Sequence, residues 1–435
     1  MHRRSSTASV PERHDPYAAL RIRDFRLLML GSFVSHLGWQ MLVVAVGWEI
    51  YLRTRSPFAL GIVGLVEVLP VMLLALPAGH AADRFDRRRV VLLCQILLGG
   101  SSLGLALLSA GRGPLALVYP CLVLLGAGMA FSSPASSALM ADIVPEQHFA
   151  NAASWDSSIG QLSSMLGPAL GGLLIALRHS AVDVYVLNAF AAGIFAFLLA
   201  LIRAKPSARA VEAATLNSLL AGIGFLRRSP VLLAALTLDL FAVFLGGAVT
   251  LMPIFALDIL KVGATGLGIL QAAPSVGAVL MALVQTRLPP WRRAGRALLV
   301  AVACFGLATI IFGLSRSFVL SLVALAVLGT CDNVSVIIRH TLLLTRVPNE
   351  MRGRIAAVND VFIGGSNELG GFESGLAATL FGPILAVVSG GVGTVLVVLL
   401  VALVWPELRK LGRLDETQAG TVADGAAAVV EPASA

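Results

Sequence analysis

Twelve long apolar runs occupy most of this 435-residue chain, and they restrict its fold more than any other feature. The runs cover 27–52, 57–79, 90–109, 114–140, 149–177, 184–202, 231–257, 265–285, 297–314, 318–344, 355–381 and 383–404. Most reach the ~20 residues that a helix needs to cross a ~30 Å bilayer core. They are longer than barrel strands and apolar all round, so only helices can satisfy their backbone in lipid. The sequence therefore predicts an all-α polytopic membrane protein with twelve transmembrane helices.

Composition and charge support a lipid environment. Hydrophobic residues make up 57% of the chain and charged residues 13%, which leaves too little polar surface for a soluble domain of this length. The net charge of +8 could indicate nucleic acid. However, the basic residues lie at the ends of the runs and form no single stripe, so no nucleic-acid partner is expected. Of the 32 Lys and Arg residues, 25 fall on the side that holds both termini and six on the other, which predicts cytoplasmic termini.

Several common features of other protein classes are missing from the sequence. The first 24 residues carry helix breakers and acids and lack a cleavable signal pattern, so the first run is expected to remain as a span. The cysteines lie inside apolar runs without paired spacing, which indicates packing residues instead of disulfides or metal ligands. No phosphate-binding loop occurs. We expect no cofactor and no metal site.

An internal repeat divides the chain. An offset of 203 residues aligns the Val144-Pro145 and Val347-Pro348 turns and places Gly167 on Gly370. The expected organisation is a cytoplasmic tail, a six-helix half, a cytoplasmic linker with an amphipathic stretch, a second six-helix half and a disordered cytoplasmic tail. Their respective boundaries are 1–26, 27–202, 203–230, 231–404 and 405–435.

The turn after the second run carries the most specific motif. Residues 79–89 follow the pattern Gly-x-x-x-Asp-Arg-x-Asp-Arg-Arg-Arg, which resembles the signature loop of the major facilitator superfamily. The motif departs from many members at Asp86, where they have Gly, and this form resembles the enterobactin-exporter-like branch of bacterial efflux proteins. The resemblance extends to most of the chain between the tails. It implies two six-helix halves that rock against each other around a central cavity.

By this resemblance, the turn forms a conformational latch on the cytoplasmic side. The latch residues are Gly79, Asp83, Arg84, Arg87, Arg88 and Asp142. When the cytoplasmic side is closed, Asp83 would lie near the positive N-terminal end of span 11 or pair with Arg87 or Arg88. Asp142 is a further candidate partner for Arg84 or Arg88. The alternative interpretation is a simple topology anchor, although an anchor needs no glycine and acid at fixed spacing.

A second motif lies in the fifth run. Gly167, Pro168, Gly171 and Gly172 resemble the antiporter motif of family exporters, in which small residues and a proline let the helix bend and approach a neighbour. Ordinary helix packing is the alternative. The sequence departs from the family at Ser154 and Ser163 and lacks a basic residue in span 4, which leaves that arginine's role in proton coupling open.

Ionisable residues at membrane depth are costly and are therefore candidates for function. The candidates for proton or substrate handling are Glu67, Asp239, Asp332, Glu368 and His36. At ~1.5 Å per residue the four acids fall within the bilayer core. For these acids a structural ion pair, to Arg339 or His340, is the alternative, and for the histidine it is a packing role with a hydrogen bond.

Together these features predict a secondary active exporter, and not an enzyme. It would move small amphipathic molecules, drugs or siderophore-like compounds, outward across the bacterial inner membrane by proton antiport, and it would function as a monomer. Spans 1, 4, 7 and 10 would line the cavity by family resemblance, with Trp39, Gln40, Phe131 and Asn333 forming a weakly polar pocket. A small-solute importer of the same fold and a non-transporting membrane receptor stay open as alternatives.

Overall fold

The computed structural model describes residues 15–203, 224–227, 229–289 and 291–412. The first helices are α1 (Arg23–Thr54), α2 (Pro57–Arg84), α3 (Arg87–Ala110), α4 (Val118–Ile143), α5 (Phe149–Arg178) and α6 (Val182–Leu201). The later ones are α8 (Pro230–Leu245), α9 (Met252–Ile254), the π-helix η4 (Phe255–Ile259), α10 (Gly263–Gln285), α11 (Ala294–Leu314), α12 (Phe318–Arg346), α13 (Asn349–Phe381), α14 (Pro383–Val404) and α15 (Pro406–Lys410). Short 3₁₀ turns η1 (Ala19–Arg21), η2 (Leu115–Leu117) and η3 (Glu146–His148) precede α1, α4 and α5.

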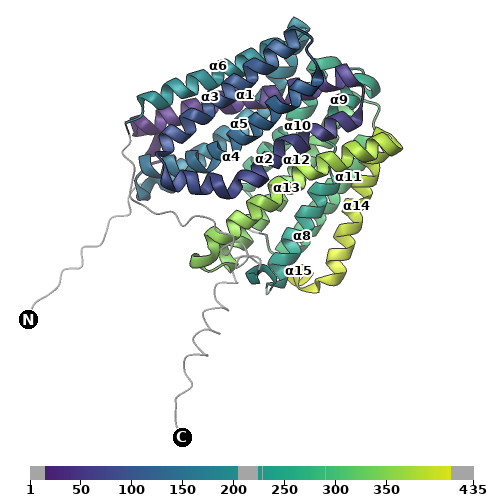
Figure 1. Ribbon diagram of the computed structural model, residues 1–435. Helices are drawn as coiled ribbons and strands as arrows, with labels where there is room; N and C mark the ends of the chain where they lie inside the picture. Colours follow the sequence, from purple (N-terminus) through teal and green to yellow (C-terminus); the bar gives the residue numbers. More distant parts are fainter. Residues whose placement is uncertain (1–14, 204–223, 228, 290, 413–435) are drawn as a thin grey trace, which may run out of the picture.

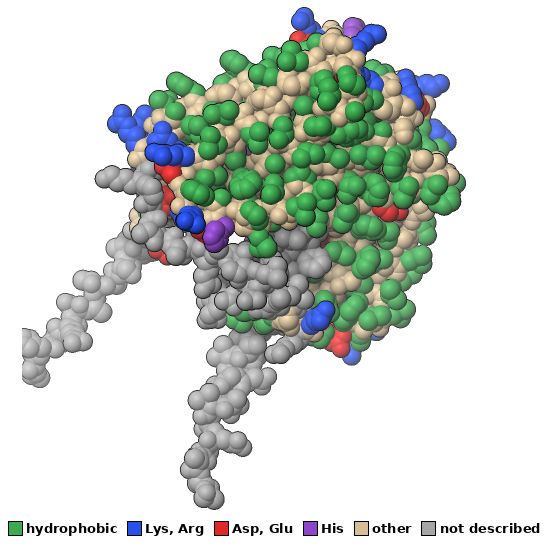
Figure 2. Space-filling model, in the orientation of Figure 1, with side chains coloured by type: hydrophobic (Ala, Val, Ile, Leu, Met, Phe, Trp, Pro, Cys, Tyr) green, Lys and Arg blue, Asp and Glu red, His purple; other side chains and the backbone are tan. Residues whose placement is uncertain are grey.

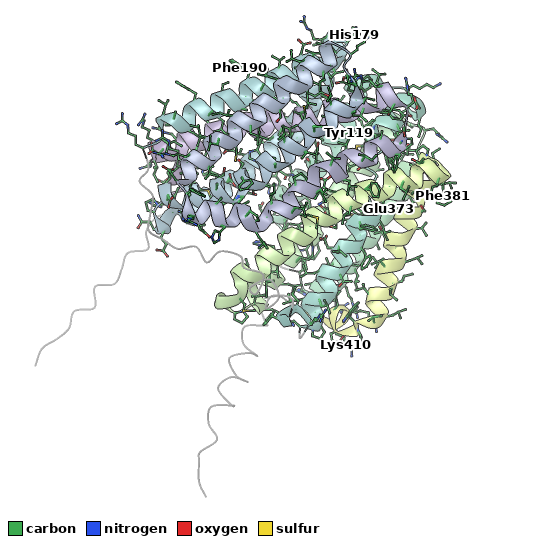
Figure 3. The ribbon with its side chains drawn as sticks, viewed as in Figure 1. Tyr119, His179, Phe190, Glu373, Phe381 and Lys410 are labelled. Atoms are coloured by element: carbon green, nitrogen blue, oxygen red, sulfur yellow. The ribbon has the colours of Figure 1, made fainter. Side chains whose placement is uncertain are left out.

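Ten of the described helices are long and apolar enough to cross a membrane. Their outward surfaces are apolar too, as Figure 2 shows: hydrophobic side chains cover the broad middle of the visible face, and Lys and Arg gather near its edges. Phe190 of α6 and Phe381 at the end of α13 each expose 66% of their surface on the outside of the bundle (Figure 3). Such exposure of large apolar side chains suits contact with lipid tails. The protein is a multi-pass, all-helical membrane protein.

The prediction of one continuous helix over 231–257 is wrong. Helix α8 ends at Leu245, and the chain turns before it resumes as α9 and η4. A Cβ atom on Gly247 would lie 2.3 Å from the Ser374 hydroxyl and 2.7 Å from the Gly370 carbonyl. The backbone of α13 therefore occupies the space that a side chain would need at this turn. A count of apolar residues does not detect a break of this kind, because the turn is as apolar as the helix.

Two close crossings join the early helices to the later ones. Helix α5 packs along α10, and α2 packs along α13. At both crossings glycine meets glycine: a Cβ on Gly172 would lie 2.8 Å from the Cα of Gly268, and one on Gly375 would lie 2.7 Å from the Cα of Gly61. Small residues let membrane helices approach to backbone contact. In Figure 1 the early helices occupy the upper part and α8, α11, α13 and α14 the lower part.

The first part of the segment predicted to be disordered, 405–435, is ordered. Residues 406–410 form α15, and Leu408 and Leu411 are buried against α8 and α11. The amide of Ala294 donates to the carbonyl of Gly412 at 3.1 Å, which fixes the end of this segment. Two apolar residues three apart are enough to dock one helical turn on the bundle. The rest of the predicted tail, 413–435, and the amphipathic part of the linker up to residue 223 lie outside the described residues.

Candidate functional site

A cavity of about 380 Å³ lies between the later helices and α5, and we call it the amide cavity. Its polar lining consists of Gln161, Thr250, Ser275, Asp332, Asn333 and Asn367. Apolar groups such as Val243, Phe305 and Leu328 complete the wall. Mostly apolar walls with a few convergent polar groups are typical of small-molecule sites. Of the predicted pocket residues, Asn333 lies here, and its Oδ1 atom is buried without a hydrogen-bond partner among the described residues.

A buried ion pair lies on the helices that line the amide cavity. Nη1 of Arg339 on α12 lies 2.7 Å from Oδ2 of Asp239 on α8, and the two side chains are 6% and 7% exposed. Nε of Arg339 also lies 3.3 Å from the hydroxyl of Ser335. Asp332 lies two turns before Arg339 on the same face of α12 and lines the cavity. The structure thus brings together two of the predicted acids with Arg339, the partner named in the ion-pair interpretation.

A second, smaller cavity of about 160 Å³ lies among the early helices, and we call it the serine cavity. Helix α4 contributes Met129, Ser132, Ser133, Ser136, Ser137 and Met140, whose spacing places them on one face. Helix α1 contributes a matching face with Ser32, Ser35, His36 and Trp39. Sequence reasoning found His36 and Trp39 but missed the serines of α4. A polar stripe at helical spacing within an apolar span was the available signal.

The remaining predicted acids, Glu67 and Glu368, lie along the α2–α13 crossing. Oε2 of Glu368 lies 2.8 Å from the position that a Cβ on Gly64 would take. Gly64 precedes Glu67 by about one turn of α2. The backbone of Glu67 itself contacts α4, because a Cβ on Gly126 would lie 2.4 Å from its carbonyl oxygen. These acids therefore form a group apart from the amide cavity.

The latch residues fall into a buried part and an exposed part. Arg87 is buried, pairs with Asp142 of α4, and donates to the carbonyls of Ala82 at 3.3 Å and Ala138 at 3.5 Å. In this structure Asp142 thus pairs with Arg87, whereas the sequence analysis named Arg84 or Arg88 as its candidate partner. Asp86 caps α3 by accepting from the amide of Arg89 at 3.3 Å. This cap starts α3 so that its first residue, Arg87, points at α4.

Asp83 and Arg84 are exposed and form no ion pair with any described residue. The pairing of Asp83 with Arg87 or Arg88 is expected only when the cytoplasmic side is closed, and it stays a prediction. Arg88 instead donates to the carbonyl of Ala200 at 2.6 Å. A Cβ on Gly79 would meet nothing within 4 Å. Only the Gly79 side of α2 therefore lacks close neighbours among the described residues, since Ala78 and Ala82 at the same end are buried.

The antiporter-like motif lies at close helix contacts. A Cβ on Gly167 would lie 2.4 Å from Cβ of Gln40 on α1, and one on Gly171 would lie 3.0 Å from Cα of Met41. Gly172 and the carbonyl of Pro168 face α10. The motif thus brings α5 into backbone contact with two helices at once. This geometry agrees with the packing interpretation and leaves the antiport role a prediction.

At the other end of the bundle, the C-terminal ends of α1 and η4 meet in a contact that the sequence analysis did not predict. Asp258 of η4 accepts a hydrogen bond from the Tyr51 hydroxyl, and its Oδ1 lies 2.9 Å from Nη1 of Arg55. The guanidinium of Arg55 lies 5.6 Å from the centre of the Tyr51 ring, within cation–π range. The available signal was that Arg55 and Asp258 both lie in predicted loops on the same side of the membrane.

A bundle of apolar helices long enough to cross a membrane, with cavities that carry polar groups between them, is typical of a membrane transporter, and comparisons with known proteins agree. The chain belongs to the transmembrane secretion effector family of the major facilitator superfamily, whose family model matches residues 14–426. The enterobactin exporter EntS of Shigella flexneri is 30% identical over 392 residues, 89% of this chain and 92% of the relative. EntS of Escherichia coli O157:H7 is 29% identical over 391 residues, with the same coverage. The predicted family and branch are confirmed.

Solved structures share the fold. A bacterial homologue of the human lysosomal transporter Spinster, in an inward-facing and occupied conformation, matches with a TM-score of 0.71 at 16% identity, over 91% of this chain and 98% of that one. A POT family transporter in complex with 5-aminolevulinic acid matches with a TM-score of 0.70 at 12% identity, over 89% and 96% of the two chains.

Proposed function

We propose that the protein is a proton-driven exporter of siderophore-like amphipathic molecules in the bacterial inner membrane. In this proposal both termini are cytoplasmic, twelve helices cross the membrane in two six-helix halves, and the protein functions as a monomer. The broken α8–η4 segment and α13 supply the seventh and eleventh crossings. The relatives named as exporters support outward transport, whereas an importer of the same fold has no specific observation in its favour.

The observation that carries this proposal is the difference between the two ends of the bundle. At one end Tyr51 and Arg55 hold Asp258 across the two halves. At the other end Asp83 is exposed and Gly79 has open space beside it. One closed end and one open latch are what an alternating-access transporter has in a single state. With the charge distribution of the loops, the closed end is the outer one, so this state faces inward.

The Asp239–Arg339 pair, with Asp332 beside it, supports proton coupling. When one partner of an ion pair within the membrane is neutralised, the other is left as an unpaired charge, which costs free energy. Protonation of Asp239 would release Arg339, whose side chain could then turn toward Asp332 or a substrate in the amide cavity. Proton binding would thereby alter the cavity wall directly. Glu67 and Glu368 are the second candidates, at a crossing that has to shift when the halves move.

The test is secretion from a bacterial strain that lacks its own siderophore exporter. The wild-type protein should restore secretion, and collapse of the proton gradient should stop it. Asp239→Asn and Asp332→Asn should both fail, while Asp183→Asn, which removes a surface acid paired with Arg178, should secrete normally. Intracellular accumulation of supplied siderophore would instead show import. Secretion that survives loss of the gradient would contradict proton antiport.

A further inference from the structure

Two cysteine thiols meet where α11 packs against α12. Cys304 of α11 and Cys331 of α12 are both free, and their side chains lie within hydrogen-bonding reach of each other. The two helices pack against each other and are joined by residues 315–317, so they run in opposite directions. The fold therefore brings together two thiols that the sequence places on different helices.

Both thiols lie near the middle of their helices and on the outer surface of the bundle. At ~1.5 Å per residue, Cys304 lies ~15 Å and Cys331 ~20 Å from the loop that joins the two helices, within a ~30 Å hydrocarbon core. Val300 and Leu307 flank Cys304 at one-turn spacing and are exposed. Val327 precedes Cys331 by one turn and is also exposed. Cys304 is itself exposed and Cys331 is partly buried, so a lipid-soluble reagent reaches the Cys304 sulfur directly.

The thiol pair adjoins the amide cavity. Phe305 and Asp332, the residues that directly follow the two cysteines, both line that cavity. The Phe305 ring also packs at the break of the seventh helix, because a Cβ on Gly246 would lie 2.7 Å from its Cε1 atom. A disulfide holds its sulfur atoms at about 2.05 Å, well inside the contact distance of two free thiols. Formation of that bond would therefore draw α11 and α12 together and shift the wall that Phe305 and Asp332 form.

The other two cysteines lie too far apart to form such a bond. Cys94 of α3 lies ~24 Å from the end of that helix at Ala110, and Cys121 lies ~5 Å from the neighbouring start of α4 at Val118. The two therefore differ by ~20 Å in depth, whereas the Cα atoms joined by a disulfide lie within about 7 Å of each other. The chain thus carries one cysteine pair that is able to close and a second, in equally apolar helices, that serves as its control.

We propose that Cys304 and Cys331 are an oxidation-sensitive pair that an organic hydroperoxide dissolved in the bilayer converts to a disulfide. In the first step the exposed sulfur of Cys304 attacks the terminal oxygen of the hydroperoxide. The O–O bond breaks, the remainder of the hydroperoxide leaves as an alcohol that takes the thiol proton, and Cys304 becomes a sulfenic acid. In the second step the sulfur of Cys331 attacks the sulfur of Cys304, and the displaced hydroxide leaves as water with the Cys331 proton.

The products suit an apolar environment. The two thiols lose two electrons, the hydroperoxide gains them, and the disulfide carries no charge that the bilayer would have to accommodate. The thiolate is the stronger nucleophile, but the neutral thiol is the stable form in hydrocarbon, so closure is slower than at a cysteine in contact with water. Reduction by a water-soluble thiol is slow for the same reason. The pair therefore responds to a sustained oxidant in the lipid and not to brief changes in the aqueous phase.

Oxidation of the full-length protein in lipid nanodiscs by cumene hydroperoxide tests the pair. After the oxidant is removed the protein is denatured, its free thiols are counted with a maleimide label, and the disulfide is located by peptide mass spectrometry. We expect the wild-type protein to lose two of its four thiols, and the double variant Cys94→Ser with Cys121→Ser to lose both that it keeps. No disulfide should form in Cys304→Ser or in Cys331→Ser. A disulfide that includes Cys94 or Cys121, or wild-type protein that keeps all four thiols, overturns the proposal.

The effect of the disulfide on transport rests on the proposed function and is measured separately. Secretion by cells treated with cumene hydroperoxide should fall severalfold with the wild-type protein and recover after a membrane-permeant reductant. Cys304→Ser should secrete equally with and without the oxidant. An equal fall in both proteins would show that the oxidant acts elsewhere and would overturn the link to the cavity wall. If the disulfide forms but no form of the protein secretes, the proposed function is wrong and the thiol pair stands; normal secretion without any disulfide removes the thiol pair alone.

Discussion

Two buried arginine–aspartate pairs differ in how completely their charges are satisfied. In the Arg87–Asp142 pair the side chains are 9% and 4% exposed, and Arg87 also donates to two backbone carbonyls. In the Arg339–Asp239 pair they are 6% and 7% exposed, and the Ser335 hydroxyl is the one additional hydrogen-bond partner of Arg339 among the described residues. The first pair fastens the α2–α3 turn to α4. The second faces another acid, Asp332, near a cavity.

This difference separates a structural ion pair from one suited to change. A guanidinium that donates to several fixed acceptors would lose hydrogen bonds if it moved. A guanidinium with one carboxylate partner and a second acid on the same helix face could exchange one carboxylate for the other. The two pairs are equally buried, so burial does not distinguish them. They differ in the number of hydrogen-bond acceptors around each arginine.

The largest effect is expected from Asp239→Asn. This change leaves Arg339 charged and buried without its carboxylate, which costs about 3–5 kcal/mol when one partner of a buried pair is removed. Proton-driven secretion should be lost, and the Tm of the purified protein should fall. Normal secretion from this variant would show that the pair is not part of the coupling machinery.

The paired replacement Asp239→Leu with Arg339→Met is expected to have a smaller effect on stability. Removal of both charges from a buried pair is often neutral or stabilising, so the Tm should recover most of what Asp239→Asn loses. Secretion should stay absent, because no titratable pair remains. The comparison of Tm and secretion in the two variants separates folding from coupling. Recovery of secretion together with Tm would mean that the pair serves structure alone.

A moderate effect is expected from Arg87→Lys. Lysine keeps the charge but lacks the planar fork that reaches Asp142 and two carbonyls, so a loss of about 1–3 kcal/mol in stability is expected. Secretion per folded molecule, measured against the amount in the membrane, should change little. A large fall in secretion per molecule with an unchanged Tm would move this pair into the transport mechanism.

Asp83→Asn should leave stability unchanged, because Asp83 is exposed and has no ion-pair partner among the described residues. Its expected effect lies in turnover, which should fall severalfold if Asp83 closes the cytoplasmic latch in the opposite state. Secretion rates at matched membrane levels measure it. A well-expressed Asp83→Asn protein with a normal rate would remove the latch from the mechanism.

The smallest effect on stability is expected from Asp258→Asn, since the Arg55 and Asp258 side chains are 55% and 43% exposed and such pairs contribute less than about 1 kcal/mol. The variant should nevertheless favour opening of the outer end. Spin labels at Arg112→Cys and Arg316→Cys, both in predicted outer loops, should report a larger fraction of long distances. An unchanged distance distribution would show that this contact does not hold the end closed.

Much of the helical architecture could be predicted from sequence, because long apolar runs have only one backbone solution in lipid. Ten of the predicted spans correspond to helices that meet the length and apolarity of a crossing. The break after Leu245 could not be predicted, since it depends on the approach of α13 to Gly247. The motif in the turn after the second run was enough to identify the family from sequence.

Individual residues of the candidate site could be predicted from sequence, but which of them lie together could not. Their depth in the membrane identified Asp239 and Asp332 as candidates, and the structure adds that both lie near Arg339. The three arginines are close together in the sequence, so their positions alone could not show that Arg87, and not Arg84 or Arg88, pairs with Asp142. Asp258 was missed because the predicted seventh span ended one residue before it. Contacts between helices that are far apart in the sequence could be identified only from the three-dimensional structure.

The interrupted seventh helix also has a consequence for biosynthesis. Helix α8 has 16 residues, ~24 Å of rise, which is less than the ~30 Å hydrocarbon core. A nascent chain that stops after Leu245 would present a segment too short to partition into the bilayer by itself. Since α8 packs against α13 and α14, a chain that lacks those two helices lacks the contacts that hold α8. We therefore expect truncations before α13 to be degraded and not to accumulate as partial bundles.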